Sequence, residues 1–163
     1  RLVPDHAEFV GEHGLFGHAK GVVGEVIDIP LIVMAAGKRG PLRVDGRRLA
    51  SQVDIAPTVL SYLGLPIPPT WRGVPLQSRP EDAAGRLVYF QQNAEFGLVA
   101  RGQDGRTWKY WIDTASDKEF AYDLDADAGE AKNRAGELDP ADTSRWRRSL
   151  LPLEVLAREG PAR

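Results

Sequence analysis

An apolar run at residues 29–36 limits the folds that are open to this chain. Nearly every position in the run is apolar, and Gly37 ends it. A strand with one face in water alternates apolar and polar side chains, so this run predicts a strand that is buried on both faces. Such strands lie at the centre of parallel sheets, whose two faces are covered by helices. The run therefore predicts an α/β fold.

A helix is predicted next, at residues 54–64. Asp54 is a favourable capping residue, Pro57 falls in the first turn where proline is tolerated, and Gly64 provides a stop. Apolar side chains recur at helical spacing, at Val59, Leu60 and Leu63. Residues 1–80 are therefore predicted to belong to an α/β domain.

From residue 87 the sequence changes character. Short aromatic and β-branched runs are separated by glycine and aspartate, and they occupy residues 87–90, 96–100, 107–112 and 119–124. Short strands with turn residues between them indicate an antiparallel meander.

A second helix is predicted near the end of the chain. Thr143 and Ser144 are expected to cap it, and it runs through Trp146 and Leu150. Pro152 is expected to kink or end it, because proline lacks the backbone N–H that an inner turn needs. Together with the strands, this helix predicts a small α+β subdomain at residues 81–163.

Composition excludes several classes of function. A chain of 163 residues that is 42% hydrophobic can bury one core of ordinary size. The net charge is −2 and the basic residues are scattered, so nucleic acid is not an expected partner. Without cysteine there is no disulfide, thiolate metal site or cysteine nucleophile. The longest apolar run is far shorter than the ~20 residues of a membrane span, so no transmembrane segment is predicted. The compartment stays open.

All three histidines lie within the first eighteen residues, among carboxylates, glycines and a lysine. Asp5 supplies a hard oxygen and His6 a borderline nitrogen, a pair that suits Ca²⁺, Mn²⁺ or Zn²⁺ without selecting among them. The alternative is a helix-capping aspartate beside an exposed histidine. These two residues alone leave both interpretations open.

His18 and Lys20 lie in a glycine-rich stretch, where a missing Cβ lets the backbone approach a ligand closely. Lys20 can place a positive charge on a substrate oxyanion, and His18 can donate a hydrogen bond or a proton to it. The alternative is a solvated lysine beside a histidine that packs on Phe16. His13 is interpreted as a structural residue of the loop.

Several short segments follow one another in a recognisable order. They are Pro4-Asp5-His6-Ala7-Glu8, Gly11-Glu12-His13-Gly14, Val53-Asp54-Ile55-Ala56-Pro57, Gly73-Val74-Pro75-Leu76, Trp108-Lys109-Tyr110, and Tyr122-Asp123-Leu124 with Gly129-Glu130 and Asn133. In this order they resemble the sulfatase family of the alkaline phosphatase superfamily, over nearly all of residues 2–134. The resemblance implies part of the alkaline-phosphatase-like sheet with its helices, followed by a small antiparallel subdomain.

The resemblance also implies a metal-dependent hydrolase of sulfate esters, on a small molecule or a glycan. Asp5 and His6 match the late pair of metal ligands in the family, with Ca²⁺ the first expectation and Mn²⁺ or Zn²⁺ as alternatives. Lys20 matches the lysine that contacts the sulfate group, and His18 is an alternative holder of that role. Ala7 departs from the family pattern, which has a glycine that turns more freely at this place.

The nucleophile of the family does not occur in this sequence. It is a formylglycine made from the first residue of a Cys/Ser-x-Pro-x-Arg motif, and the nearest match, at residues 78–82, ends in Asp82. The chain is therefore expected to be a carboxy-terminal portion of a sulfatase that is inactive alone, with the formylglycine in the amino-terminal half. Two alternatives remain: a phosphonate or phosphodiester hydrolase of the same superfamily, and a non-catalytic binding module.

Overall fold

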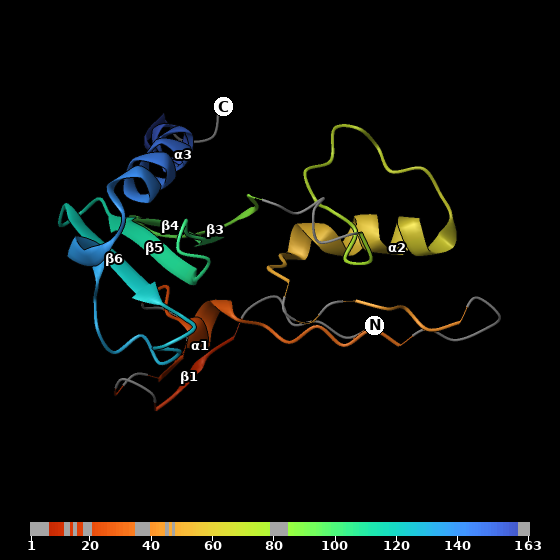
Figure 1. The fold of residues 1–163 in the computed structure, drawn as a ribbon, viewed down its shortest axis with the longest axis horizontal. Helices are drawn as coiled ribbons and strands as arrows, with labels where there is room; N and C mark the ends of the chain where they lie inside the picture. The colour runs from red at the N-terminus through yellow and green to blue at the C-terminus, as the bar shows by residue number, and fades with distance from the viewer. Residues whose placement is uncertain are drawn as a thin grey trace. The chain divides into compact units, whose positions relative to one another are not determined.

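The computed structural model describes residues 7–11, 14, 16–17, 21–34, 40–44, 46, 48–78 and 85–159. The chain forms two compact units (Figure 1). The helical unit contains Pro30–Val88, and the sheet unit contains Pro4–Ile29 and Tyr89–Arg163. Helices and antiparallel sheets together make a mixed α/β fold, which confirms the predicted class.

Four strands form the main sheet, in the order β3 (Leu87–Gln92), β4 (Glu95–Arg101), β5 (Thr107–Asp113) and β6 (Lys118–Asp123). Both β4 and β6 run antiparallel to β5. The strands predicted between residues 87 and 124 are therefore all present.

Gly97 of β4 lies opposite Trp111 of β5 in this sheet. A Cβ at position 97 would lie 2.3 Å from Cζ of Phe90 and 2.6 Å from Cβ of Trp111. The glycine therefore makes room for the ring of Phe90 and the Cβ of Trp111.

One face of the sheet is covered by α3 (Pro140–Glu159), as Figure 1 shows. Tyr110 of β5 points to this face, and its ring centroid lies 6.0 Å from that of Trp146. Tyr110 and Trp146 are both fully buried, and Leu150 is 2% exposed one turn further along α3. These side chains form the core between the helix and the sheet.

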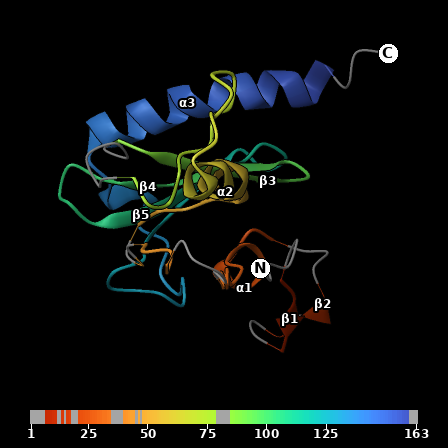
Figure 2. The ribbon, with the colours of Figure 1, turned by 90° about the vertical axis from the view of Figure 1, so that its right-hand side faces the viewer.

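The opposite face carries Trp111, because successive side chains of a strand alternate between faces. Trp111 stacks on Phe120 and Tyr122 of β6, with centroid distances of 4.9 and 5.2 Å. Val22 is 1% exposed and packs in the same cluster. Val22 comes just before the short helix α1 (Gly24–Ile27), which Figure 2 shows on the side of the sheet away from α3. The N-terminal segment therefore completes the second face.

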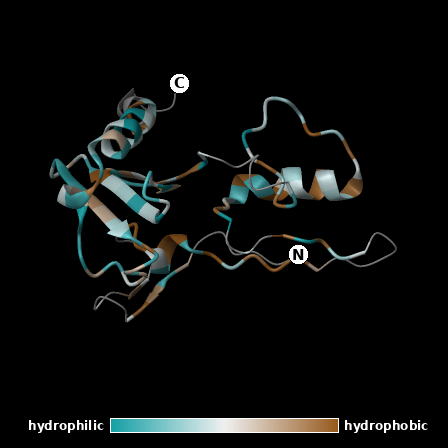
Figure 3. Ribbon diagram, viewed as in Figure 1, coloured by the Kyte–Doolittle hydropathy of each residue, from teal (hydrophilic) through white to brown (hydrophobic). Residues whose placement is uncertain are grey.

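The helix α3 begins earlier than predicted, and Pro152 does not end it. It is capped by Asp139, whose Oδ1 accepts a hydrogen bond from the backbone N–H of Ala141 at 2.8 Å, so Thr143 lies inside the first turn. It also continues through Pro152 to Glu159. Proline removes one hydrogen bond to the carbonyl four residues earlier, and Arg148 at that place is exposed, so water can satisfy its carbonyl. Figure 3 shows hydrophilic residues along much of this helix.

The helical unit contains the predicted helix, α2 (Ile55–Leu63), which follows the 3-10 turn η2 (Gln52–Asp54). Gly64 ends α2 in the left-handed conformation, with φ 71°. Its N–H reaches the carbonyls of the last turn, the termination that a glycine at this place predicts. The predicted helix is confirmed.

Asp54 does not cap α2 with its side chain, contrary to the prediction. Its Oδ1 accepts a hydrogen bond from the N–H of Val74 at 2.7 Å, and its Oδ2 accepts one from the N–H of Ser51 at 2.9 Å. Arg86 Nη2 lies 2.5 Å from both oxygens. This fully buried carboxylate therefore joins three segments of the helical unit.

The strand predicted at residues 29–36 is not formed in residues 29–34, where backbone pairing is limited to a single bridge at Ile32. Ile32 is 53% exposed and Met34 79% exposed. A central strand of a parallel sheet needs a paired strand on each side. Apart from the bridge at Ile32, the only strand residues in the described part of the helical unit are the first two of β3. Residues 35 and 36 lie outside the described residues.

Candidate functional site

The residues predicted to carry the chemistry are Asp5, His6, His18 and Lys20, and all four lie outside the described residues, as does His13. The structure describes the segments that flank them: residues 7–11, 14, 16–17 and 21–27. They lie within or next to the histidine-rich run, which is defined as residues 5–20.

Part of the run forms a small antiparallel ribbon. Its strands are β1 (Phe9–Val10) and β2 (Phe16–Gly17), with Phe9 opposite Gly17. Phe9 is 3% exposed, so one side of the ribbon is anchored in the protein. Gly17 and Gly21 have φ values of 80° and 81°. These are conformations that glycine adopts without strain, so glycine here serves the backbone path.

Both flanks of the run are attached to α1. The backbone N–H of Ala7 donates to the carbonyl of Val26 at 3.1 Å. On the other side, Gly21 leads through the buried Val22 directly into Gly24, the first residue of α1. His6 precedes Ala7 and Lys20 precedes Gly21, so the flanks of both predicted groups meet at one short element.

A buried ion pair lies beneath α1. Lys109 of β5 is 1% exposed, and its Nζ lies 2.7 and 2.8 Å from the two carboxylate oxygens of Glu130. The backbone N–H of Gly24 donates to Oε1 of the same carboxylate at 2.7 Å. Glu130 therefore links the sheet to the first residue of α1.

Burial lowers the pKa of Lys109, although Glu130, Asp28 and Glu25 all act to raise it. Burial also raises the pKa of Asp28, where Lys109 acts in the opposite direction and Glu25 adds to the rise. Nearby charges therefore act on the pKa values of Lys109 and Asp28. Desolvation is the dominant effect for both Lys109 and Asp28.

Sequence reasoning did not assign a role to Lys109 or Glu130, although both lie in segments that carry the family resemblance. The available signal was a lysine inside an aromatic strand, since Lys109 lies between Trp108 and Tyr110. A charged side chain at such a position is rarely buried unless it has a partner.

No cluster of three or more metal-binding side chains of the types His, Asp and Glu occurs among the described residues. The metal prediction therefore rests on Asp5 and His6. A carboxylate oxygen and an imidazole nitrogen fit a divalent cation chemically, but two protein ligands do not complete a coordination shell.

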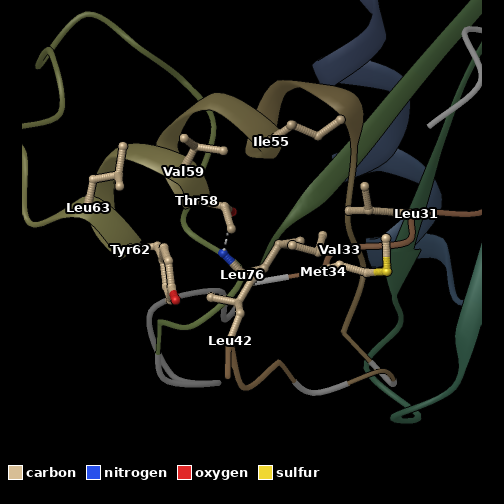
Figure 4. A pocket seen from close by; sticks show the side chains of 10 residues that line it. All are labelled: Leu31, Val33, Met34, Leu42, Ile55, Thr58, Val59, Tyr62, Leu63 and Leu76. Atoms are coloured by element: carbon tan, nitrogen blue, oxygen red, sulfur yellow. Dashed lines mark hydrogen bonds between the residues drawn. The ribbon is translucent and has the colours of Figure 1, made fainter. Parts of the chain in front are cut away.

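The helical unit has an apolar pocket of about 150 Å³ on one side of α2 (Figure 4). Its lining is almost entirely aliphatic, and it includes Leu31, Met34 and Val59. Thr58 Oγ1 donates to the carbonyl of Asp54 and accepts from the N–H of Leu76, so its hydroxyl is already committed. None of the described residues that line this pocket carries a charge.

Arylsulfatase K of Mus musculus is 29% identical to the chain over 150 residues, which are 82% of this chain and 26% of the relative. The chain is similar in sequence to this sulfatase. No family profile matches it. The chain spans about a quarter of the length of this sulfatase.

Two solved structures share the fold. A candidate sulfatase from Bacteroides thetaiotaomicron VPI-5482 has a TM-score of 0.64 and 22% identity over 92% of this chain and 34% of its own. A 2-O GAG sulfatase has a TM-score of 0.62 and 21% identity, with the same shares covered. At this identity, the two structures show only that the chain shares their fold. Among the described residues, no helix is both long and apolar enough to cross a membrane.

Proposed function

We propose that this chain supplies the metal-ligand and sulfate-contact residues for the hydrolysis of a sulfate ester. The observation that carries the proposal is that both flanks of the histidine-rich run meet α1: Ala7 donates to the carbonyl of Val26, and Gly21 continues through Val22 into the helix. The order of the sequence segments and the relationship to Arylsulfatase K support the same reaction class.

Asp5 and His6 would hold the divalent cation, with Ca²⁺ expected first and Mn²⁺ or Zn²⁺ as alternatives. A bound cation would polarise an oxygen of the substrate and stabilise the negative charge that develops there. Lys20 would contact a sulfate oxygen as a point charge, and His18 is the alternative for that role. The substrate would be a sulfate ester of a small molecule or a glycan.

The 163 residues contain no candidate for the formylglycine nucleophile. We therefore expect the purified 163-residue chain to release no sulfate from an aryl sulfate, and to bind Ca²⁺ only weakly by calorimetry because it provides two ligands. Sulfate release by this chain alone would contradict the proposed division of roles.

A kinetic test uses the natural polypeptide that contains this chain. Lys20→Ala is expected to lower kcat/KM for an aryl sulfate by about 100- to 1000-fold, the range for removing one group that stabilises a developing oxyanion. Lys118→Ala is the matched control, because Lys118 is an exposed lysine at the start of β6.

His18→Ala tests the alternative holder of the sulfate contact in the same assay. A loss with His18→Ala and none with Lys20→Ala would move the role to His18. Full activity in both variants would contradict the proposal. Turnover of a phosphonate or phosphodiester in preference to the sulfate ester would replace the proposed reaction with the other chemistry of the superfamily.

A further inference from the structure

One tryptophan of the chain is exposed, and it lies in the helical unit. Trp71 is 43% exposed, whereas Trp108, Trp111 and Trp146 are at most 5% exposed. Arg72 follows Trp71 directly and is also exposed. Tryptophan and arginine are among the residue types that most often dominate the affinity of a binding surface. The pair Trp71-Arg72 is therefore a candidate binding surface that the proposed function does not use.

The guanidinium of Arg72 is available to a ligand. No hydrogen bond or ion pair joins it to any residue that the structure describes. By contrast, Arg86 of the same unit binds Asp54. A guanidinium carries five N–H donors in a planar fork, a geometry that matches the oxygens of an anionic group. Arg72 therefore favours a ligand with a negative charge.

Both ends of the segment that carries this pair are fixed. At its start, the N–H of Leu65 donates to the carbonyl of Leu60 in α2 at 2.9 Å. At its end, a Cβ at Gly73 would lie 1.9 Å from the carbonyl oxygen of Val53, so the backbone packs directly on η2. Figure 1 shows the segment leaving the end of α2 and returning towards its start.

The segment is also stiff within itself. Prolines occupy positions 66, 68 and 69, and proline fixes φ near −65°. The carbonyl of Pro68 accepts the N–H of Trp71 at 3.1 Å, which closes a turn with Pro69 at its second position, where proline is favoured. A ligand that binds such a segment restricts little remaining motion, so more of the contact energy contributes to affinity.

The charge of the helical unit also favours an anionic ligand. Residues 30–88 of this unit include eight basic and four acidic residues, although the whole chain has a net charge of −2. Positive charge is therefore concentrated in this unit. Such an asymmetry attracts anions to the part of the chain that carries Arg72.

We propose that Trp71 and Arg72 bind a sulfated glycan, with the indole stacked on a sugar ring and the guanidinium on a sulfate group of that sugar. The C–H groups on one face of a sugar ring are attracted to the electron-rich face of an indole. The Cα atoms of adjacent residues are about 3.8 Å apart, so one sulfated sugar reaches both side chains. The choice of a sulfated glycan rests on the proposed function, whereas the surface itself rests on Trp71, Arg72 and the anchored segment.

The test measures the binding of dextran sulfate to the natural polypeptide that contains this chain, with neutral dextran as the matched ligand. Trp71→Ala should weaken binding by about 3- to 10-fold, the range for the loss of one aromatic contact. Arg72→Ala should make binding less sensitive to salt, because it removes one contact with a sulfate group. Both side chains are exposed, so the melting temperature should not change. Arg148→Ala, which removes an exposed arginine of α3, is the control and should bind as the unchanged protein does.

Tryptophan fluorescence locates the bound polymer. Dextran sulfate should reduce the quenching of the unchanged protein by acrylamide, because it covers the exposed indole of Trp71. Trp71→Phe keeps an aromatic face, so it should retain most of the binding while losing this protection. Protection that persists in Trp71→Phe would place the polymer elsewhere and overturn the inference.

Other results would also overturn the inference. They are unchanged affinity in both alanine variants, a loss in Arg148→Ala equal to that in Arg72→Ala, and equal binding of neutral dextran. Tighter binding of single-stranded oligothymidylate than of dextran sulfate, lost in Trp71→Ala, would replace the glycan with a nucleic acid. None of these assays measures sulfate release, so a failure of the proposed function shows separately, as full activity of both Lys20→Ala and His18→Ala.

Discussion

Asp54→Ala is expected to destabilise the helical unit by about 3–5 kcal/mol, the range for breaking a buried ion pair by removing one partner. Asp54 is 1% exposed and its side chain binds Arg86, which is 11% exposed. The variant leaves the guanidinium without its counter-ion and the N–H groups of Ser51 and Val74 without an acceptor. Such a loss is a large part of the stability of an ordinary domain.

Hydrogen exchange measures this loss where it occurs. The amides of α2 should lose protection in Asp54→Ala, while those of β5 should not, because the two elements belong to different compact units. Asp117→Asn is a suitable control, since Asp117 is exposed and its φ of 54° suits asparagine. Unchanged protection of α2 would show that Asp54 does not join the segments of the helical unit.

Trp146→Ala is expected to destabilise the sheet unit by about 3–5 kcal/mol, because the variant leaves a large cavity between α3 and the sheet. Trp146 is fully buried and faces Tyr110, and Leu150 lies beside it on the same side of α3. The expected measurement is a lower urea midpoint with loss of the tertiary signal of the sheet.

Trp146→Phe provides the matched comparison. The indole Nε1 of Trp146 is buried and has no hydrogen-bond partner among the described residues, so phenylalanine removes an unpaired polar group and leaves a smaller cavity. The loss should be much smaller than in the alanine variant. If Trp146→Phe lost as much stability as Trp146→Ala, an aromatic ring at this position would contribute little by filling the space between α3 and the sheet.

The antiparallel sheet could be predicted because its signals are local. Each strand is a short aromatic run between turn residues, and the strands pair with their neighbours in sequence. The helix α2 was equally accessible, because Pro57 and Gly64 mark its two ends. In contrast, residues 29–34 are apolar but largely exposed, so an apolar run alone predicts neither burial nor a strand partner. A strand there needs neighbours on both sides, which the described part of the helical unit does not contain.

The candidate site could be predicted only as a set of residue types. Asp5, His6, His18 and Lys20 were identified from their order and the family resemblance, and they remain predictions. The support for that run was harder to see, because Glu130 follows Gly24 by more than a hundred residues. No periodic pattern joins a glycine to a carboxylate so far along the chain. Only the folded sheet brings Lys109, Glu130 and Gly24 together.

The calcium dependence of sulfate-ester hydrolysis tests the central claim most directly, in the natural polypeptide that contains this chain. We expect a chelator to abolish hydrolysis, and Ca²⁺, or Mn²⁺ or Zn²⁺ in its place, to restore it. Asp5→Asn should raise the cation concentration needed for half-maximal activity by about tenfold or more, since affinity depends on the charge of the ligands. Asp117→Asn should leave that concentration unchanged. Hydrolysis that survives the chelator, or the same cation dependence in Asp5→Asn as in the unchanged protein, would contradict the claim.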